Sequence, residues 1–153
     1  MPGIREVRRM PWTAEQMFDL VADVARYGDF LPWVVATRVR SDSETEMVAD
    51  MLIGFNALRE KFTSRVEKRR AELIKVHYVD GPLRDLDNVW VFSDCAGGGC
   101  EVDFSVEFTF RNAVFEALAG QYFERAFRKM VDAFETRAEV LYGSSNSSAT
   151  SIA

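Results

Sequence analysis

Residues 102–110 carry the strictest pattern in the chain, a two-residue alternation that holds without exception. One parity is filled by valine and phenylalanine, and the other by aspartate, serine, glutamate and threonine. Successive side chains of a β-strand point to opposite faces, so this segment predicts a strand with one apolar and one solvated face. Such alternation is typical of antiparallel sheets, because the strands of parallel sheets are buried on both faces.

Directly after this strand the period changes to three and four residues. Asn112 is a suitable N-cap, and Gly143 follows the last apolar position. The pattern predicts an amphipathic helix from there to about Leu141, roughly 40 Å long at 1.5 Å per residue, which is longer than a strand of about nine residues. Its apolar stripe consists of Phe115, Leu118, Ala119, Tyr122, Phe123, Ala126, Phe127, Met130, Val131, Phe134, Ala138 and Leu141.

The two-residue period extends over residues 34–111, which predicts a meander of six strands. Turn signals divide it at residues 41–43, near 56, and at 68–70, 80–82 and 96–99.

The N-terminal part predicts a short strand over residues 4–10 and then a helix. Thr13 and Gln16 are spaced as a capping box at the start of this helix, which we expect to end near Tyr27 and Gly28. The short aromatic segment 30–33 follows, and Pro32 prevents it from continuing as a regular helix.

Length and charge limit the remaining possibilities. With 153 residues, 48% of them hydrophobic, we expect one α+β domain over residues 1–143 and a disordered tail over 144–153. A net charge of -5 argues against DNA as a partner. The chain has no apolar run of about 18 residues and no signal-peptide pattern, so we expect a cytoplasmic protein, with contact to the inner membrane surface as a further possibility.

Few residues favour catalysis. His77 is the single histidine, and its parity predicts that it points away from the apolar face. Cys95 and Cys100 flank a glycine-rich turn; we favour reduced thiols there over a cross-hairpin disulfide. No zinc-ligand spacing and no phosphate-binding loop occurs. Glu60 is the best candidate for an acid or base because its parity points inward, but a charge at a cavity mouth or strand edge is the simpler interpretation.

The aromatic content is more informative than the polar residues. Twelve phenylalanines and three tryptophans exceed what a minimal core requires, and several fall on the sheet face and the helix stripe that must oppose each other. A curved sheet closed by one long helix often leaves a gap, and apolar pockets with few polar groups are the usual form of small-molecule sites. We therefore expect an apolar cavity beneath the helix rather than a solid core.

Several segments resemble the Coq10/RatA group of the START-like (helix-grip, polyketide cyclase-like) superfamily. The resemblance covers about residues 4–141 and rests on VARYGDFLPW at 24–33, VADMLIGFNALREKFTS at 48–64, the Gly-Pro and Leu-x-Asn-x-Trp-x-Phe pieces between 81 and 92, and residues 102–110 with the long helix. It implies a helix-grip fold, in the order β-α-α-β6-α, with a curved antiparallel sheet of about seven strands wrapped around the C-terminal helix.

The resemblance also implies a function. It points to non-catalytic binding of ubiquinone or a related isoprenoid lipid, in support of respiratory electron transport, with no cofactor beyond that bound ligand. Phe30, Pro32 and Trp33 would form the entrance or a membrane-facing edge. The resemblance and the strand parity together indicate the remaining candidate ligand-binding residues. They are Met51, Ile53, Phe55, Phe62, Val76, Tyr78, Trp90, Phe92, Phe104, Val106, Phe108, Phe123, Phe127, Met130 and Phe134.

Two other functions stay open at this point. The same family includes a toxin-like factor that binds the large ribosomal subunit and blocks subunit association, although an acidic chain argues against it. The wider superfamily includes cyclases and dehydratases of aromatic polyketides, which would need inward polar groups such as Glu60.

Overall fold

The computed structural model describes the backbone of residues 3–55 and 58–143, and their side chains except those of residues 55, 58, 115 and 118–124. The predicted tail at 144–153 and the predicted turn near Asn56 lie outside the described residues. Seven strands, two α-helices and one 3-10 helix follow one another as β1 (Gly3–Met10), α1 (Ala14–Ala22), η1 (Val24–Asp29), β2 (Val34–Asp42), β3 (Glu46–Phe55), β4 (Leu58–Arg69), β5 (Leu73–Asp80), β6 (Leu83–Asp94), β7 (Cys100–Phe110) and α2 (Ala113–Tyr142).

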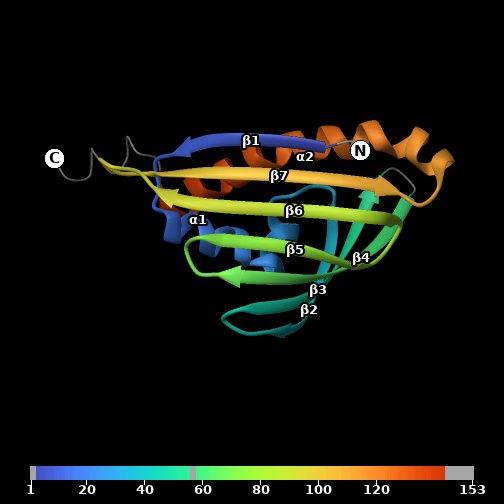
Figure 1. Ribbon diagram of the computed structural model, residues 1–153, viewed down its shortest axis with the longest axis horizontal. Coiled ribbons are helices and arrows are strands. Elements are labelled where there is room, and N and C mark those ends of the chain that lie inside the picture. Colours follow the sequence, from blue (N-terminus) through green and yellow to red (C-terminus); the bar gives the residue numbers. More distant parts are fainter. Residues whose placement is uncertain (1–2, 56–57, 144–153) are drawn as a thin grey trace.

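All seven strands form one antiparallel sheet in the order β1-β7-β6-β5-β4-β3-β2. The predicted six-strand meander is therefore confirmed, and β1 joins it by pairing with β7. In Figure 1 the strands β2 and β3 turn away from the direction of β6 and β7, while α1 and α2 lie on one side of the sheet. This is the predicted helix-grip arrangement, in which a curved sheet holds the last helix.

The first helical segment differs from the prediction. The capping box is present, since Thr13 Oγ1 accepts from the backbone N–H of Gln16 and the Gln16 side chain accepts from that of Thr13. The α-helix ends at Ala22 instead of continuing to Tyr27, because Asp23 leaves helical geometry (φ -84°, ψ 65°) and donates its N–H to Leu20. The tighter helix η1 then follows, so the second helix of the implied fold is a 3-10 helix.

The last helix begins and ends where the sequence predicts. The Asn112 side chain accepts a hydrogen bond from the backbone N–H of Val114, as an N-cap does, and Gly143 has a positive φ of 82° just after the end. Its 30 residues correspond to about 45 Å. Over the described residues, no helix combines the length and apolarity needed to cross a membrane.

The last helix is fastened to the N-terminal segment at several points. The indole N–H of Trp12 donates to the carbonyl of Gly143 at 2.7 Å, and the Tyr142 hydroxyl donates to the carbonyl of Gln16 at 3.1 Å. Arg8 on β1 binds Asp132 at 2.6 Å and Glu135 at 3.0 Å. These contacts fix the C-terminal half of α2 against the sheet edge and the first helix.

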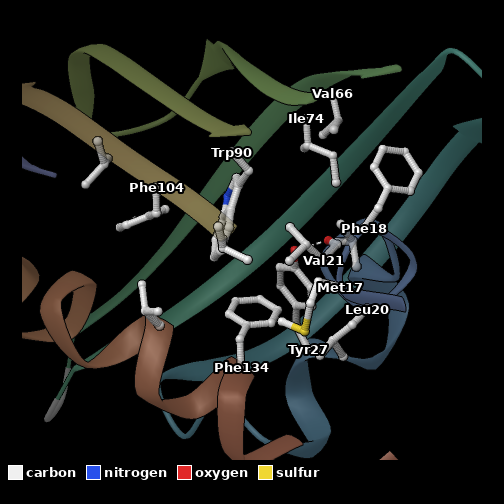
Figure 2. Packing of buried hydrophobic residues seen from close by; sticks show 14 of the residues in the cluster. Met17, Phe18, Leu20, Val21, Tyr27, Val66, Ile74, Trp90, Phe104 and Phe134 are labelled. Carbon is white, nitrogen blue, oxygen red and sulfur yellow. Dashed lines mark hydrogen bonds between the residues drawn. The ribbon is translucent and has the colours of Figure 1, made fainter. Parts of the chain in front are cut away.

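A tightly buried part of the core lies between β7, β6 and α2. The alternation predicted for residues 102–110 is confirmed, since every inward residue of that row is at most 3% exposed. Figure 2 shows the ring of Trp90 reaching from the sheet toward Phe134 of α2, with Tyr27 beside it. The Phe134 ring centroid lies 5.1 Å from that of Trp90 and 5.3 Å from that of Tyr27, both in edge-to-face geometry.

Candidate functional site: an apolar cavity between the sheet and the last helix

A cavity of about 140 Å³ lies between the inner face of the sheet and the helices. By the same kind of measure a single water needs about 10–15 Å³, and an engineered cavity of about 150 Å³ in another protein binds benzene. The space is therefore large enough for a ring or a short branched chain. It is lined by Val21, Val24, Tyr27, Trp33, Ala49, Met51, Ile53, Phe62, Ser64, Val66, Ile74, Val76, Leu83, Leu86, Asn88, Trp90, Ala126, Phe127 and Met130.

The inner faces of four adjacent strands, β3 to β6, supply most of the lining. Strand register explains how they meet, because Val76 on β5 pairs with Val66 on β4 and with Asn88 on β6. Helix α1 and η1 close one side through Val21 and Val24, and α2 covers the cavity with Ala126, Phe127 and Met130. The cavity therefore lies where the prediction put it, between the sheet and the stripe of the last helix.

Besides the indole N–H groups of Trp33 and Trp90, two lining side chains carry polar groups with unused hydrogen-bonding capacity. The Asn88 amide nitrogen donates to the carbonyl of Ser105 at 2.9 Å. Among the described residues, its amide oxygen and the hydroxyl of Ser64 have no hydrogen-bond partner. The cavity is thus apolar with a small number of polar points, as small-molecule sites usually are.

Tyr27 is an ionisable residue in the lining, and it is held neutral. Its hydroxyl donates to the backbone carbonyl of Val21 inside the core. Burial raises the pKa of Tyr27 well above its ordinary value, and the negative charge of Asp23 adds to this effect. The hydroxyl therefore keeps its proton at neutral pH, and its hydrogen bond links η1 to α1.

Eight of the predicted ligand-binding residues line this cavity. Their role in binding stays a prediction, but the structure does bring them together around one space. They are Trp33, Met51, Ile53, Phe62, Val76, Trp90, Phe127 and Met130.

Six other predicted residues with described side chains do not line it. Four of them, on β7 and the adjoining part of β6, are covered by the helices and are 1–3% exposed, and the fifth, Phe134, packs from α2 against Trp90 at 1% exposure. The four strand residues are Phe92, Phe104, Val106 and Phe108. Tyr78 uses its hydroxyl to accept from the N–H of Leu83 at 2.9 Å. Phe55 and Phe123 complete the predicted set, and their side chains lie outside the described residues.

The predicted entrance residues occupy three different environments. Trp33 lines the cavity and is half-buried, while Pro32 is exposed. Phe30 is half-buried, with its ring centroid 5.1 Å from that of Phe134 and the Arg137 guanidinium 5.5 Å above its own centroid. Only Trp33 therefore reaches the cavity, whereas Phe30 and Pro32 do not line it.

Sequence reasoning missed eleven lining residues. Several are small or polar residues at inward parities, notably Ala49, Ser64, Asn88 and Ala126. A search for inward positions with little side-chain volume would have found them, because space remains where side chains are short. The other seven are ordinary apolar residues that no pattern distinguishes from core: Val21, Val24, Tyr27, Val66, Ile74, Leu83 and Leu86.

The residues considered for catalysis lie elsewhere. His77 faces outward, as predicted, 3.3 Å from Glu67, and Glu60 is half-buried without lining the cavity. Cys95 and Cys100 are free thiols, and burial raises the pKa of Cys100 to about 11, which keeps it protonated at neutral pH. Across the described part of the chain, no group of three or more His, Cys, Asp or Glu side chains is arranged to hold a metal ion.

The sequence matches a known family over most of its length. Residues 10–135 match the family described as polyketide cyclase / dehydrase and lipid transport. The ribosome association toxin RatA of Pseudomonas aeruginosa is 35% identical over 134 residues, which are 88% of this chain and 93% of the toxin. The mitochondrial coenzyme Q-binding protein COQ10 homolog B of Xenopus laevis is 32% identical over 142 residues, which are 90% of this chain and 58% of that protein.

A solved structure agrees in both sequence and fold. The 18 kDa protein CC1736 of Caulobacter crescentus superimposes with a TM-score of 0.72 at 34% identity, covering 94% of this chain and all of that one. The two relatives above support the resemblance to the Coq10/RatA group, and this structure supports the fold over nearly the whole described length.

Proposed function

This chain belongs to the polyketide cyclase / dehydrase and lipid transport family, and from that premise we propose that it binds ubiquinone or a related isoprenoid lipid without transforming it. The cavity between α2 and the sheet is the observation that carries the proposal. Its lining is apolar except for a few neutral groups, which suits a hydrophobic guest. The proposed role is to support respiratory electron transport by holding this lipid.

The size of the cavity limits how such a ligand would sit. About 140 Å³ accommodates a ring or a few carbon atoms of a chain, not a long isoprenoid tail. The rest of the ligand would lie along Trp33 toward solvent or a membrane. The proposal accordingly assigns the protein to the cytoplasm, with contact to the inner membrane surface when it loads or releases the lipid.

Extraction of the purified protein into organic solvent, followed by mass spectrometry, tests this function. We expect a quinone or isoprenoid lipid at a substantial fraction of one equivalent. The control is the Ala126→Leu variant, which fills part of the cavity from α2 while leaving the surface unchanged. Equal amounts of lipid from both proteins would mean that the lipid adheres elsewhere, and no lipid from the wild-type protein would contradict the proposal.

A second candidate function is inhibition of ribosomal subunit association. The names of the relatives favour it, since proteins at 32% to 36% identity over most of this chain are ribosome association toxins. Sucrose-gradient profiles after overexpression test it: the toxin function predicts fewer 70S particles and more free subunits. The Ala126→Leu variant separates the two functions, because subunit association should respond to it only if a bound lipid is required.

A further inference from the structure

The wall of the cavity contains an amide whose orientation is fixed by the sheet. Asn88 donates its Nδ2 to the carbonyl oxygen of Ser105 at 2.9 Å. A carbonyl oxygen can only accept, so the atom beside it must be the amide nitrogen, and the Asn88 oxygen is directed elsewhere. Asn88 lines the cavity, and its Oδ1 acceptor and the second hydrogen of Nδ2 are not used by that bond.

The rest of the wall is neutral. Among the described lining residues, the hydrogen-bonding side chains besides Asn88 are Ser64, Tyr27 and the indoles of Trp33 and Trp90. Tyr27 already donates to Val21. A carboxylate or phosphate placed here would lose its hydration without gaining a counter-charge, which is strongly unfavourable. An uncharged oxygen would lose much less and could recover it from one hydrogen bond.

We propose that the cavity selects ligands whose buried end is an uncharged group bearing a carbonyl or hydroxyl oxygen, and that Asn88 is the residue that recognises this oxygen. A carbonyl would accept from Nδ2, and a hydroxyl would donate to Oδ1, so one amide serves the oxidised and the reduced form of a quinone ring. This inference rests on the proposed binding function. It adds the chemical class of the head group and the residue that forms a hydrogen bond with it.

Three probes with saturated tails of similar length test the selection: 2-decyl-1,4-benzoquinone, decylbenzene and decanoate. Binding of the quinone is followed through quenching of tryptophan fluorescence, since Trp33 and Trp90 line the cavity, and the other two are measured by displacement of the quinone. For the wild-type protein we expect the quinone to bind about tenfold more tightly than decylbenzene, as one satisfied hydrogen bond predicts. Decanoate should bind more weakly than either.

The Asn88→Leu variant replaces the amide with an apolar side chain of similar size. We expect it to weaken quinone binding about tenfold and to leave decylbenzene binding unchanged or slightly tighter. Leu86→Met is the matched control, because Leu86 lines the same cavity from the same strand two residues away. It should change the affinity for both probes by the same small factor.

Asn88→Thr is a second variant in case the leucine variant does not fold, since threonine suits a strand and also lacks the amide. An Asn88 variant that binds the quinone as tightly as wild type, or that loses both probes equally, overturns the role of Asn88. Decanoate binding as tight as that of the quinone overturns the selection for an uncharged end. A wild-type protein that binds neither the quinone nor decylbenzene contradicts the proposed function itself, which is a different result from equal binding of the two.

Discussion

Strands β7 and β4 both turn one face toward the helices, yet β7 builds solid core and β4 borders the cavity. On β7 the inward residues Phe104 and Phe108 are 1% exposed. On β4 the inward residues Phe62 and Ser64 are half-buried and line open space. Both strands alternate between inward and outward side chains, so the two-residue period alone does not explain the difference.

The difference follows from what stands opposite each strand. Phe134 of α2 packs its ring against Trp90, whose ring centroid is 4.5 Å from that of Phe104, so aromatic side chains fill the space over β7 on this side of Trp90. About two turns before Phe134, α2 presents the short side chain of Ala126 to the cavity. The short side chains of Ala126 on the helix and of Ala49 and Ser64 on the sheet all border the cavity, which accounts for part of its space.

We expect the largest loss of stability when an aromatic ring is removed from the packed core over β7. Phe104→Ala should lower the free energy of unfolding by about 3–5 kcal/mol, because it opens a new void in close-packed surroundings. Phe62→Ala should cost less than half of that, since Phe62 already borders empty space. Urea denaturation of both variants gives the comparison. Equal losses would show that Phe62 is packed as tightly as Phe104.

A medium effect comes from adding volume at two alanines of the same helix. Ala138, at 0% exposure, lies in the packed core, so Ala138→Leu should lower the free energy of unfolding by about 1–3 kcal/mol through overpacking. Ala126→Leu should raise it by about 0.5–2 kcal/mol because the side chain enters the cavity. Alanine and leucine have similar helix propensities, so the two changes are matched. Thermal and urea unfolding would contradict the contrast if both variants shifted in the same direction.

We expect the smallest change in stability from a substitution on the charged outer face of the sheet, which contrasts with its neutral inner face. Asp50 accepts hydrogen bonds from the Thr63 hydroxyl and from Arg40, both at 2.7 Å, and these contacts, the Thr63 bond first, hold the pKa of Asp50 below its usual range. Asp50→Asn should cost about 1 kcal/mol at pH 7, a modest value because Arg40 is half exposed and solvent screens the pair.

The pH dependence of that cost has a definite sign. A carboxylate whose pKa is lowered by folding stabilises the protein above the unfolded value of about 3.9, and this contribution is lost as the pH falls through the lower folded value. The difference between wild type and Asp50→Asn in urea unfolding should therefore vanish in strong acid. Ser64→Ala on the inner face serves as the control, and its effect should not change with pH. A difference for Asp50→Asn that persists at pH 2 would contradict this account.

Much of the fold was predictable because its patterns are periodic and local. The alternation of residues 102–110 and the stripe ending near Leu141 predicted β7 and α2 almost to their ends. The break between α1 and η1 was not predictable, since the apolar spacing of Val21 and Val24 fits a continuous helix and only the backbone at Asp23 interrupts it.

The site was less predictable than the fold. Bulky aromatic residues were taken as cavity lining, but Phe104 and Phe108 fill space rather than border it. Whether an inward side chain lines a cavity depends on the sizes of the side chains that face it from three or four other strands and helices. Asn88 and Ser64 carried a local signal, as polar residues at inward positions, whereas Val66 and Ile74 carried none.

The hydrogen bond from Trp12 to Gly143 joins positions 131 residues apart in the chain. During synthesis all seven strands emerge before the second half of α2, so the sheet exists for a time without the helix that covers it. Contacts this distant in sequence also form slowly. A sheet formed at that stage would expose the apolar face around Trp90, and surface of that kind is what makes incompletely folded chains prone to aggregation.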